Sequence, residues 1–300
     1  MFYQVEAFSD KPFFGNPTAI VIEDSKESYP LHFKESIARE MNLPITAFIS
    51  QSTKADFKIA FFSPKKQVPF SGHATLASVW LLAKLKNIKP NTDTVKIETE
   101  KGIYPCDILW EKETITKIFV TLKNPEFQEI DIDKQKLADI LGIRTDKIES
   151  NEKLPLVVAD VGSPKILVLI SSKEMIDALV PKYDEVERLC RKHKATGLHL
   201  YTFDTYTEGS TCYTRHFEPL QGAAETAVSG LANGALAAFL VKEGFAPPGT
   251  LIIEQGESLD RNSKIEIKVE ATKSGIKSVK IGGKAQVMFK FELNKEINTS

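Results

Sequence analysis

A histidine at the start of an apolar segment is the first residue whose type and position suggest chemistry. His73 follows Ser71 and Gly72 and opens the segment 73–86, whose continuous apolar character predicts a buried helix. A glycine at a helix start lets a ligand approach backbone N–H groups, whose dipoles favour negative charge. The same dipoles disfavour a cationic imidazole, so a neutral His73 is suited to contact a bound anion or to accept a proton. The alternative is a histidine that satisfies loop backbone groups, behind a Ser71 that caps the helix.

A second segment has the same arrangement. Ser229, Gly230 and Leu231 precede another apolar stretch, and backbone N–H groups at Gly230 and Leu231 are a second candidate site for a carboxylate. Glu225 lies shortly before them and could act as a base if burial raised its pKa toward neutrality. The alternatives are a supporting role for Glu225, a cap for Ser229 and a tight turn for Gly230.

A third candidate for ligand contact is Asn16. It stands between Gly15 and Pro17, in what we expect to be a turn between two strands. Its amide offers both a donor and an acceptor for a carboxylate or an amino group. A role in the turn alone would also explain this tripeptide.

The two segments belong to a longer internal repeat. Residues 61–84 and 216–242 each read as a strand, Phe-x-Pro, a loop, Ser-Gly and an apolar helix, and the second loop is three residues longer. Such a repeat indicates a duplicated half-fold. We therefore predict that Gly72 and Gly230 face each other across one cleft.

The elements that position these residues alternate between strands and helices. Period-two apolar patterns predict strands at both ends of each half, and patterns with helical spacing cover 31–43, 134–143 and 172–193. The expected fold class is α+β. The composition turns acidic and polar after Pro125, and there we place the crossing into a second domain.

Composition excludes several classes of protein. The chain of 300 residues has a net charge of −1, which gives no long-range field for nucleic acid or an anionic membrane. Its three cysteines show no C-x-x-C spacing, and it lacks the common zinc, phosphate-loop and dinucleotide motifs. With no signal-like N-terminus and no long apolar run, we expect a cytoplasmic protein that uses neither metal nor cofactor.

Several motifs in order resemble the PhzF-like family, named after a phenazine-biosynthesis isomerase and sharing the diaminopimelate epimerase fold. They are F-G-N-P at 14–17, N-L-x-x-T-A-F at 42–48, F-F-S-P at 61–64, S-G-H-A-T-L-A at 71–77, T-E-x-G at 99–102, R-x-F-x-P at 215–219, E-Q-G at 254–256 and Asp-Arg at 260–261. The resemblance implies a site between two similar domains, isomerisation or epimerisation without a cofactor, a small-molecule substrate and a homodimer. It also implies two similar domains that each wrap a mixed sheet around a central helix. The C-terminal segment would return to complete the first domain, so we place the first domain at 1–125 plus 286–294 and the second at 126–285.

The chain departs from the family pattern at acid/base positions. Where the resemblance implies a glutamate and an aspartate, this chain has Ile45 and Thr226, and the family serine is Leu231. His73 and Glu225 are the proton-transfer candidates that remain at matched positions. Two functions stay open: an isomerase or epimerase acting on a small carboxylate-bearing metabolite with an altered acid/base set, or a non-catalytic small-molecule-binding protein of the same fold.

Overall fold

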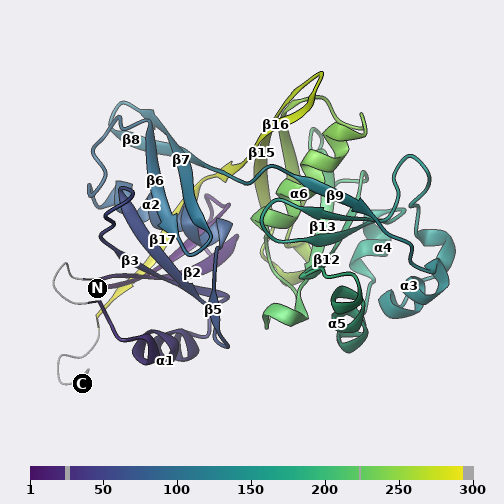
Figure 1. The fold of residues 1–300 in the computed structure, drawn as a ribbon, viewed down its shortest axis with the longest axis horizontal. Coiled ribbons are helices and arrows are strands. Elements are labelled where there is room, and N and C mark those ends of the chain that lie inside the picture. Colours follow the sequence, from purple (N-terminus) through teal and green to yellow (C-terminus); the bar gives the residue numbers. More distant parts are fainter. Residues whose placement is uncertain (24–27, 223, 293–300) are drawn as a thin grey trace. The chain divides into compact units, whose positions relative to one another are not determined.

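The computed structural model describes residues 1–23, 28–222 and 224–292. Contacts between residues divide the chain into two compact units, one comprising Met1–Thr121 with the chain from Gly282 onward, and one comprising Leu122–Ile281. Residues 293 and 294 of the predicted first domain lie outside the described residues. Figure 1 follows the path through both units by colour.

The first unit is a mixed sheet with two helices. Its elements are β1 (Phe2–Ala7), β2 (Asn16–Ile22), α1 (Leu31–Met41), β3 (Ile45–Ser50), β4 (Phe57–Phe62), β5 (Gln67–Val68), α2 (Gly72–Lys84), β6 (Thr94–Thr99), β7 (Gly102–Glu111), β8 (Thr114–Thr121) and β17 (Ala285–Phe291). Strand β17 pairs antiparallel with β1, with Phe2 opposite Phe291. The yellow C-terminal strand therefore lies beside the purple N-terminal one in Figure 1, as the sequence predicted.

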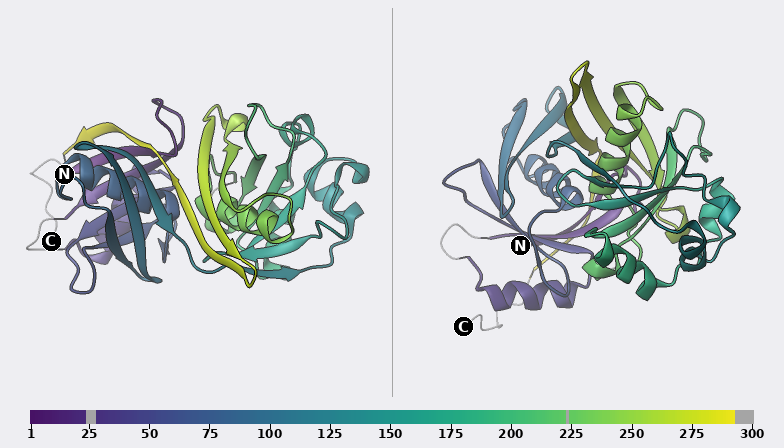
Figure 2. Two further views of the ribbon diagram at one scale, coloured as in Figure 1. Left: turned by 90° about the horizontal axis from the view of Figure 1, so that it is seen from above. Right: turned by 45° about the vertical axis from the view of Figure 1, so that its right-hand side comes forward.

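Helix α2 is the centre of the first unit. Every residue from Ala74 to Ala83 is buried, so the helix has no face left for solvent. It packs against β1, β2, β3, β8 and β17, strands from both ends of the unit (Figures 1 and 2). A helix that is apolar on all sides must be enclosed in this way, which confirms the predicted central helix.

The second unit contains the remaining elements. They are β9 (Glu126–Glu129), α3 (Lys134–Leu141), a 3₁₀ turn (Thr145–Lys147), β10 (Val157–Asp160), β11 (Lys165–Leu169), α4 (Lys173–Asp177), α5 (Tyr183–Lys192), β12 (Gly197–Thr202), β13 (Cys212–Phe217), a 3₁₀ turn (Pro219–Gln221), α6 (Gly230–Lys242), β14 (Gly249–Gln255), a 3₁₀ turn (Glu257–Leu259), β15 (Ser263–Thr272) and β16 (Gly275–Gly283), which runs to the boundary. Helix α6 is buried from Ala232 to Val241 and packs against β10, β11 and β15.

Both units repeat one order of strand pairing. Along β1, β2, β3, β4, β6 and β7 the pairs alternate antiparallel, parallel, antiparallel, parallel, antiparallel. The strands β10, β11, β12, β13, β14 and β15 follow the same order. The central helix occupies the same interval in each, α2 between β4 and β6 and α6 between β13 and β14. The α+β fold with an internal repeat is confirmed.

The predicted turn around Asn16 is wrong in one respect. Asn16 and Pro17 are already part of β2, opposite Ala7 and Glu6 of β1, and Gly15 alone remains in the loop. Gly15 has φ +82°, and a Cβ built on it would lie 2.3 Å from the carbonyl oxygen of Ala7. Only glycine fits at this position, because any side chain would collide with the backbone of Ala7. The loop can therefore close tightly, and β2 begins at the next residue, Asn16.

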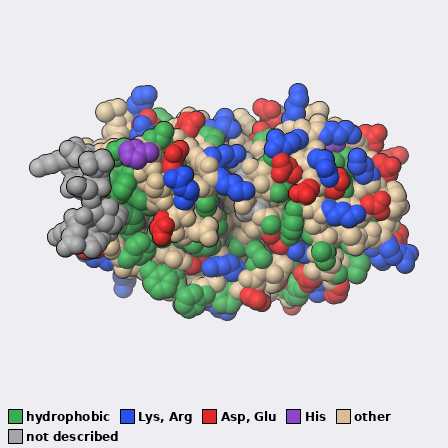
Figure 3. All heavy atoms as spheres, turned by 90° about the horizontal axis from the view of Figure 1, so that it is seen from below, with side chains coloured by type: hydrophobic (Ala, Val, Ile, Leu, Met, Phe, Trp, Pro, Cys, Tyr) green, Lys and Arg blue, Asp and Glu red, His purple; other side chains and the backbone are tan. Residues whose placement is uncertain are grey.

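Charges of both signs are interspersed on the face that Figure 3 shows, with neither sign forming a continuous field there. Of the helices in the described residues, none combines the length and apolarity needed to span a bilayer.

A close backbone approach in the first unit supplies a test of the packing. A Cβ at Gly282 would lie 2.2 Å and 2.5 Å from ring atoms of Phe119 and 2.6 Å from the carbonyl oxygen of Ile118. We expect Gly282→Ala to lower the free energy of unfolding by about 1–3 kcal/mol, because overpacking a full core forces its neighbours to move. Urea denaturation measures this. Gly282→Val must cost more than Gly282→Ala, and a neutral alanine variant would contradict the described packing.

Candidate functional site

The start of helix α2 gathers polar groups in the first unit. The Ser71 side chain accepts from the N–H of Ala74 at 3.5 Å, which makes it the predicted helix cap. Its Oγ also lies 3.2 Å from Nδ1 of the half-buried His73. Gly72 is the first residue of the helix. The side chain of His73 is therefore held against the cap, while ligand contact by Ser71, Gly72 and His73 stays a prediction.

Asn16 and Ile45 lie at one edge of the sheet in the same unit. Asn16 opens β2, Ile45 opens β3, and the two strands run parallel with Ile45 beside Thr18. Both side chains are buried. The end of β4 reaches this edge, because Phe62 pairs with Thr46, and the loop to α2 leaves from there. An aliphatic side chain cannot carry a proton, so Ile45 can only shape this edge.

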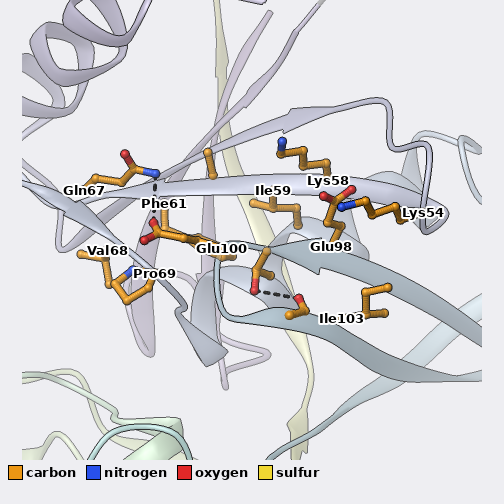
Figure 4. Close-up of a pocket in the computed structure, with 13 residues that line it drawn as sticks. Lys54, Lys58, Ile59, Phe61, Gln67, Val68, Pro69, Glu98, Glu100 and Ile103 are labelled. Carbon is orange, nitrogen blue, oxygen red and sulfur yellow. Dashed lines mark hydrogen bonds between the residues drawn. The ribbon is translucent and has the colours of Figure 1, made fainter.

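A hollow of about 610 Å³ borders that loop (Figure 4). Its lining comes from β4, β5 and β6 and their neighbouring turns: Lys54, Lys58, Ile59, Ala60, Phe61, Gln67, Val68, Pro69, Glu98, Thr99, Glu100, Gly102 and Ile103. The side chain of Gln67 donates to Glu100 at 3.2 Å across it. None of the predicted site residues lines the hollow, although Val68 and Pro69 continue directly toward Ser71.

The start of α6 in the second unit is held by a different network. Ser229 caps the helix through the N–H of Ala232 at 3.4 Å. The Gln255 side chain accepts from the N–H of Ser229 at 3.1 Å and from Asn233 at 2.7 Å, and donates to the carbonyl oxygen of Thr226 at 2.8 Å. Gly230 and Leu231 begin the helix behind this network. The E-Q-G segment found in the sequence thus fixes the loop that precedes the helix.

Glu225 has both carboxylate oxygens occupied by one arginine. Nε and Nη2 of Arg215 donate to it at 2.8 Å and 2.7 Å, and the hydroxyl of Ser258 donates at 2.6 Å. Its side chain is 8% exposed and that of Arg215 is 7% exposed. Nη1 of Arg215 donates to the carbonyl oxygen of Ile176 at 2.8 Å. This geometry favours the supporting role that the sequence left open for Glu225.

A second carboxylate, which the sequence analysis did not single out, lies closer to Thr226. Oε1 of Glu218 accepts from the hydroxyl of Thr226 at 2.8 Å, and Oε2 accepts from Nζ of Lys165 at 3.1 Å. Nε2 of His216 lies 3.3 Å from the same oxygen. Burial alone would raise the pKa of Glu218, but Lys165 and His216 hold it well below its usual range. The signal in the sequence was a glutamate inside the repeated Phe-x-Pro motif.

Two histidines of this unit are fully buried. His199 and His216 are both 0% exposed, although neither lies in one of the apolar helices that the sequence marks as buried. Their ring centroids lie 5.3 Å apart, and Nε2 of His199 lies 3.1 Å from Oδ1 of Asn233. Burial lowers the pKa of both imidazoles, that of His199 especially. Both are therefore neutral near pH 7.

The three thiols lack the features of a nucleophile. Cys106, Cys190 and Cys212 are all buried and unbridged, and burial raises the pKa of Cys190 to about 11. In the part of the chain that the structure describes, no three His, Cys, Asp or Glu side chains are grouped to hold a metal ion.

The buried histidines predict a loss of stability in mild acid. Each imidazole has an ordinary pKa of 6.5 that folding lowers. Below pH 6.5 the unfolded chain therefore binds protons that the folded chain does not bind. Stability is therefore fully present above that value and falls as pH decreases, by up to about 1.4 kcal/mol per pH unit per group. Urea denaturation between about pH 7.5 and about pH 5.5 measures this slope.

A variant pair controls for other titrating groups. Replacing both His199 and His216 by glutamine should flatten the slope, while His32→Gln should leave it unchanged because His32 is exposed. An undiminished slope in the double variant would show that other groups cause the acid sensitivity.

The Arg215–Glu225 pair predicts a large structural penalty. Glu225→Ala leaves the buried guanidinium without its carboxylate and should cost about 3–5 kcal/mol of unfolding free energy. The matched control is Glu187→Ala, which removes the carboxylate of an exposed ion pair with Arg191 and should cost under about 1 kcal/mol. Equal losses in the two variants would refute a buried pairing for Glu225.

Comparisons with known proteins agree with this fold. A family model described as phenazine biosynthesis-like protein, PhzC-PhzF, matches residues 5–290. An uncharacterized isomerase of Clostridium acetobutylicum is 33% identical over 301 residues, which covers 97% of each chain. The crystal structure of a PhzF-family phenazine biosynthesis protein of Bacillus anthracis superposes with a TM-score of 0.88 at 23% identity, covering 98% of each chain.

A structure with lower sequence identity to this chain also has a similar fold. A hydroxyproline epimerase of Agrobacterium vitis, solved with trans-4-hydroxy-L-proline, has a TM-score of 0.63 at 12% identity and covers 96% of this chain and 90% of its own. The chain therefore belongs to the PhzC-PhzF family of phenazine biosynthesis-like proteins, with an epimerase-like fold and relatives named as isomerases.

Proposed function

We propose that this protein is a cofactor-independent isomerase or epimerase of a small carboxylate-bearing metabolite. The observation that carries the proposal is the repeated helix start: a serine cap, then a glycine, then a fully enclosed helix in each half of a chain from an isomerase-named family. That both starts serve one substrate between the halves is the prediction from sequence, and it remains part of the proposal.

The helix starts suit a carboxylate. The first N–H groups of a helix have no partner within the helix, and their dipoles favour an anion. Ser71 and Ser229 satisfy the N–H of the third helical residue, Ala74 and Ala232. We propose that the substrate carboxylate binds at the N–H groups of the glycine and of the residue after it, with Asn16 as a further contact.

The proposed reaction moves a proton at carbon. A carboxylate held by N–H donors makes the hydrogen on its neighbouring carbon easier to remove, because the charge that develops is stabilised. The electron pair stays in the substrate, so an isomerisation or epimerisation needs no electron acceptor. We propose His73 as one proton-transfer group, held by the Ser71 hydroxyl at 3.2 Å.

The wider biochemical setting belongs to the same proposal. We expect the protein to act on a free metabolite in the cytoplasm as a homodimer, with no nucleic-acid or membrane partner. The nearly balanced charge of −1 supports the expected absence of nucleic-acid and membrane partners, because it provides no electrostatic attraction for polyanions.

Hydrogen–deuterium exchange tests the activity without knowledge of the product. The protein is incubated in D₂O with L-proline, trans-4-hydroxy-L-proline, L-glutamate and itaconate, and deuterium uptake at carbon is followed by mass spectrometry. We expect exchange in at least one acid, and a loss of about 10²–10⁴-fold in His73→Ala because a general acid or base is removed.

The matched control is His32→Ala, which removes an exposed imidazole and should exchange at the original rate. Calorimetry on the same acids separates the alternatives. Binding of an acid with no exchange in any would identify a non-catalytic binder and overturn the proposed chemistry.

A further inference from the structure

We propose that Glu218 is the proton-transfer carboxylate of the second unit, because folding brings it beside Thr226 across the 3₁₀ turn Pro219–Gln221. The inference rests on the proposed function and names a residue for it. Its basis is the hydrogen bond of 2.8 Å between Thr226 Oγ1 and Glu218 Oε1. An acidic group is thereby placed on the loop that leads into α6.

Accessibility separates Glu218 from its neighbour Glu225. The Glu225 side chain is 8% exposed and has both oxygens engaged by Arg215. The Glu218 side chain is 18% exposed, and Oε1 receives a neutral hydroxyl rather than a cation. Of these two carboxylates, Glu218 is thus the more exposed, and its Oε1 accepts from a hydroxyl that is neutral.

The surroundings of Glu218 keep it ionised and correctly placed. Lys165, whose side chain is 3% exposed, also contacts Thr196 at 2.8 Å and is thereby held on strand β11. His216 on β13 lies 3.3 Å from the carboxylate, and His199 on β12 packs against His216. Lys165 and His216 thus contact the carboxylate from β11 and β13, and His199 supports His216 from the strand between them. The carboxylate is therefore held ionised and in one position.

A purely structural ion pair would not need this arrangement. Burying Lys165 and Glu218 costs desolvation energy that their attraction repays only in part. Two apolar residues would connect β11 to the loop at a lower cost. Both charges lie where β13 leads into the loop before α6, and one carboxylate oxygen accepts from the Thr226 hydroxyl on that loop.

The proposed step conserves atoms and electrons. A carbon next to the substrate carboxylate loses its hydrogen: the C–H bond breaks, and an O–H bond forms on Glu218. The electron pair remains in the substrate as a delocalised carbanion. When the proton on Glu218 returns to a different carbon, the product is an isomer. When it returns to the opposite face of the same carbon, the product is an epimer. In both cases Glu218 is an anion again.

The first test moves the carboxylate. Glu218→Gln keeps the size and the hydrogen-bonding capacity of the side chain and should slow deuterium exchange by about 10²–10⁴-fold. Glu218→Gln combined with Thr226→Asp restores a carboxylate within hydrogen-bond distance of the original one. The double variant should exchange deuterium at least about tenfold faster than Glu218→Gln alone. The thermal unfolding of each variant is recorded, so a rate loss can be separated from unfolding.

The second test uses the pH dependence of exchange. Lys165→Met removes the cation that lowers the pKa of Glu218, so the acid limb of the rate profile should move to higher pH. A merely structural role would lower the rate without moving that limb. If Lys165→Met does not fold, the Thr226→Asp rescue decides the question.

The outcomes distinguish this inference from the function on which it rests. Full exchange activity in folded Glu218→Gln would overturn the role of Glu218 and leave the proposed function standing. Failure of the double variant to regain activity, with an unmoved acid limb in Lys165→Met, would also overturn it. An unaltered protein that exchanges no acid of the panel would overturn the proposed function and, with it, this inference.

Discussion

Each unit of this protein depends on the burial of a helix that has no polar side. Such a helix is stable in water only when strands enclose it completely, because any open side would expose apolar surface. The first unit meets this demand by bringing β17 back to β1, so the two ends of the chain share one sheet. The second does so with strands on either side of α6. The pairing order and the position of the helix follow from this constraint.

Enclosing the helix also limits where polar groups can lie. Its interior is closed, so the first peptide groups at its start are the part left for a ligand. In both units a serine caps this start. In the second unit Gln255 and Asn233 additionally fix the loop through buried hydrogen bonds. These hydrogen bonds hold the loop in one conformation before any ligand is present.

The two starts differ in their electrostatics although their backbones repeat. At the first start the half-buried His73 lies against the capping Ser71, whereas the loop before the second start contains the carboxylates of two ion pairs. One of these pairs is closed around Arg215, and the other leaves an oxygen of Glu218 next to Thr226. The two repeated halves therefore differ in charge at the starts of their central helices.

Much of this organisation followed from the sequence alone. Apolar periodicity located the strands and both central helices, the Ser-Gly repeat located their starts, and ordered motifs indicated the family, because these signals are local in the chain. What the sequence could not reveal depends on contacts between distant residues. His199 is buried through contacts with His216 and Asn233, which are distant in the chain, and Glu225 was a candidate base until Arg215 was seen to hold it. Glu218 gained significance only when folding brought Lys165, from another strand, to its carboxylate. Charge pairing and burial are properties of three-dimensional packing, so they were decided by the tertiary structure.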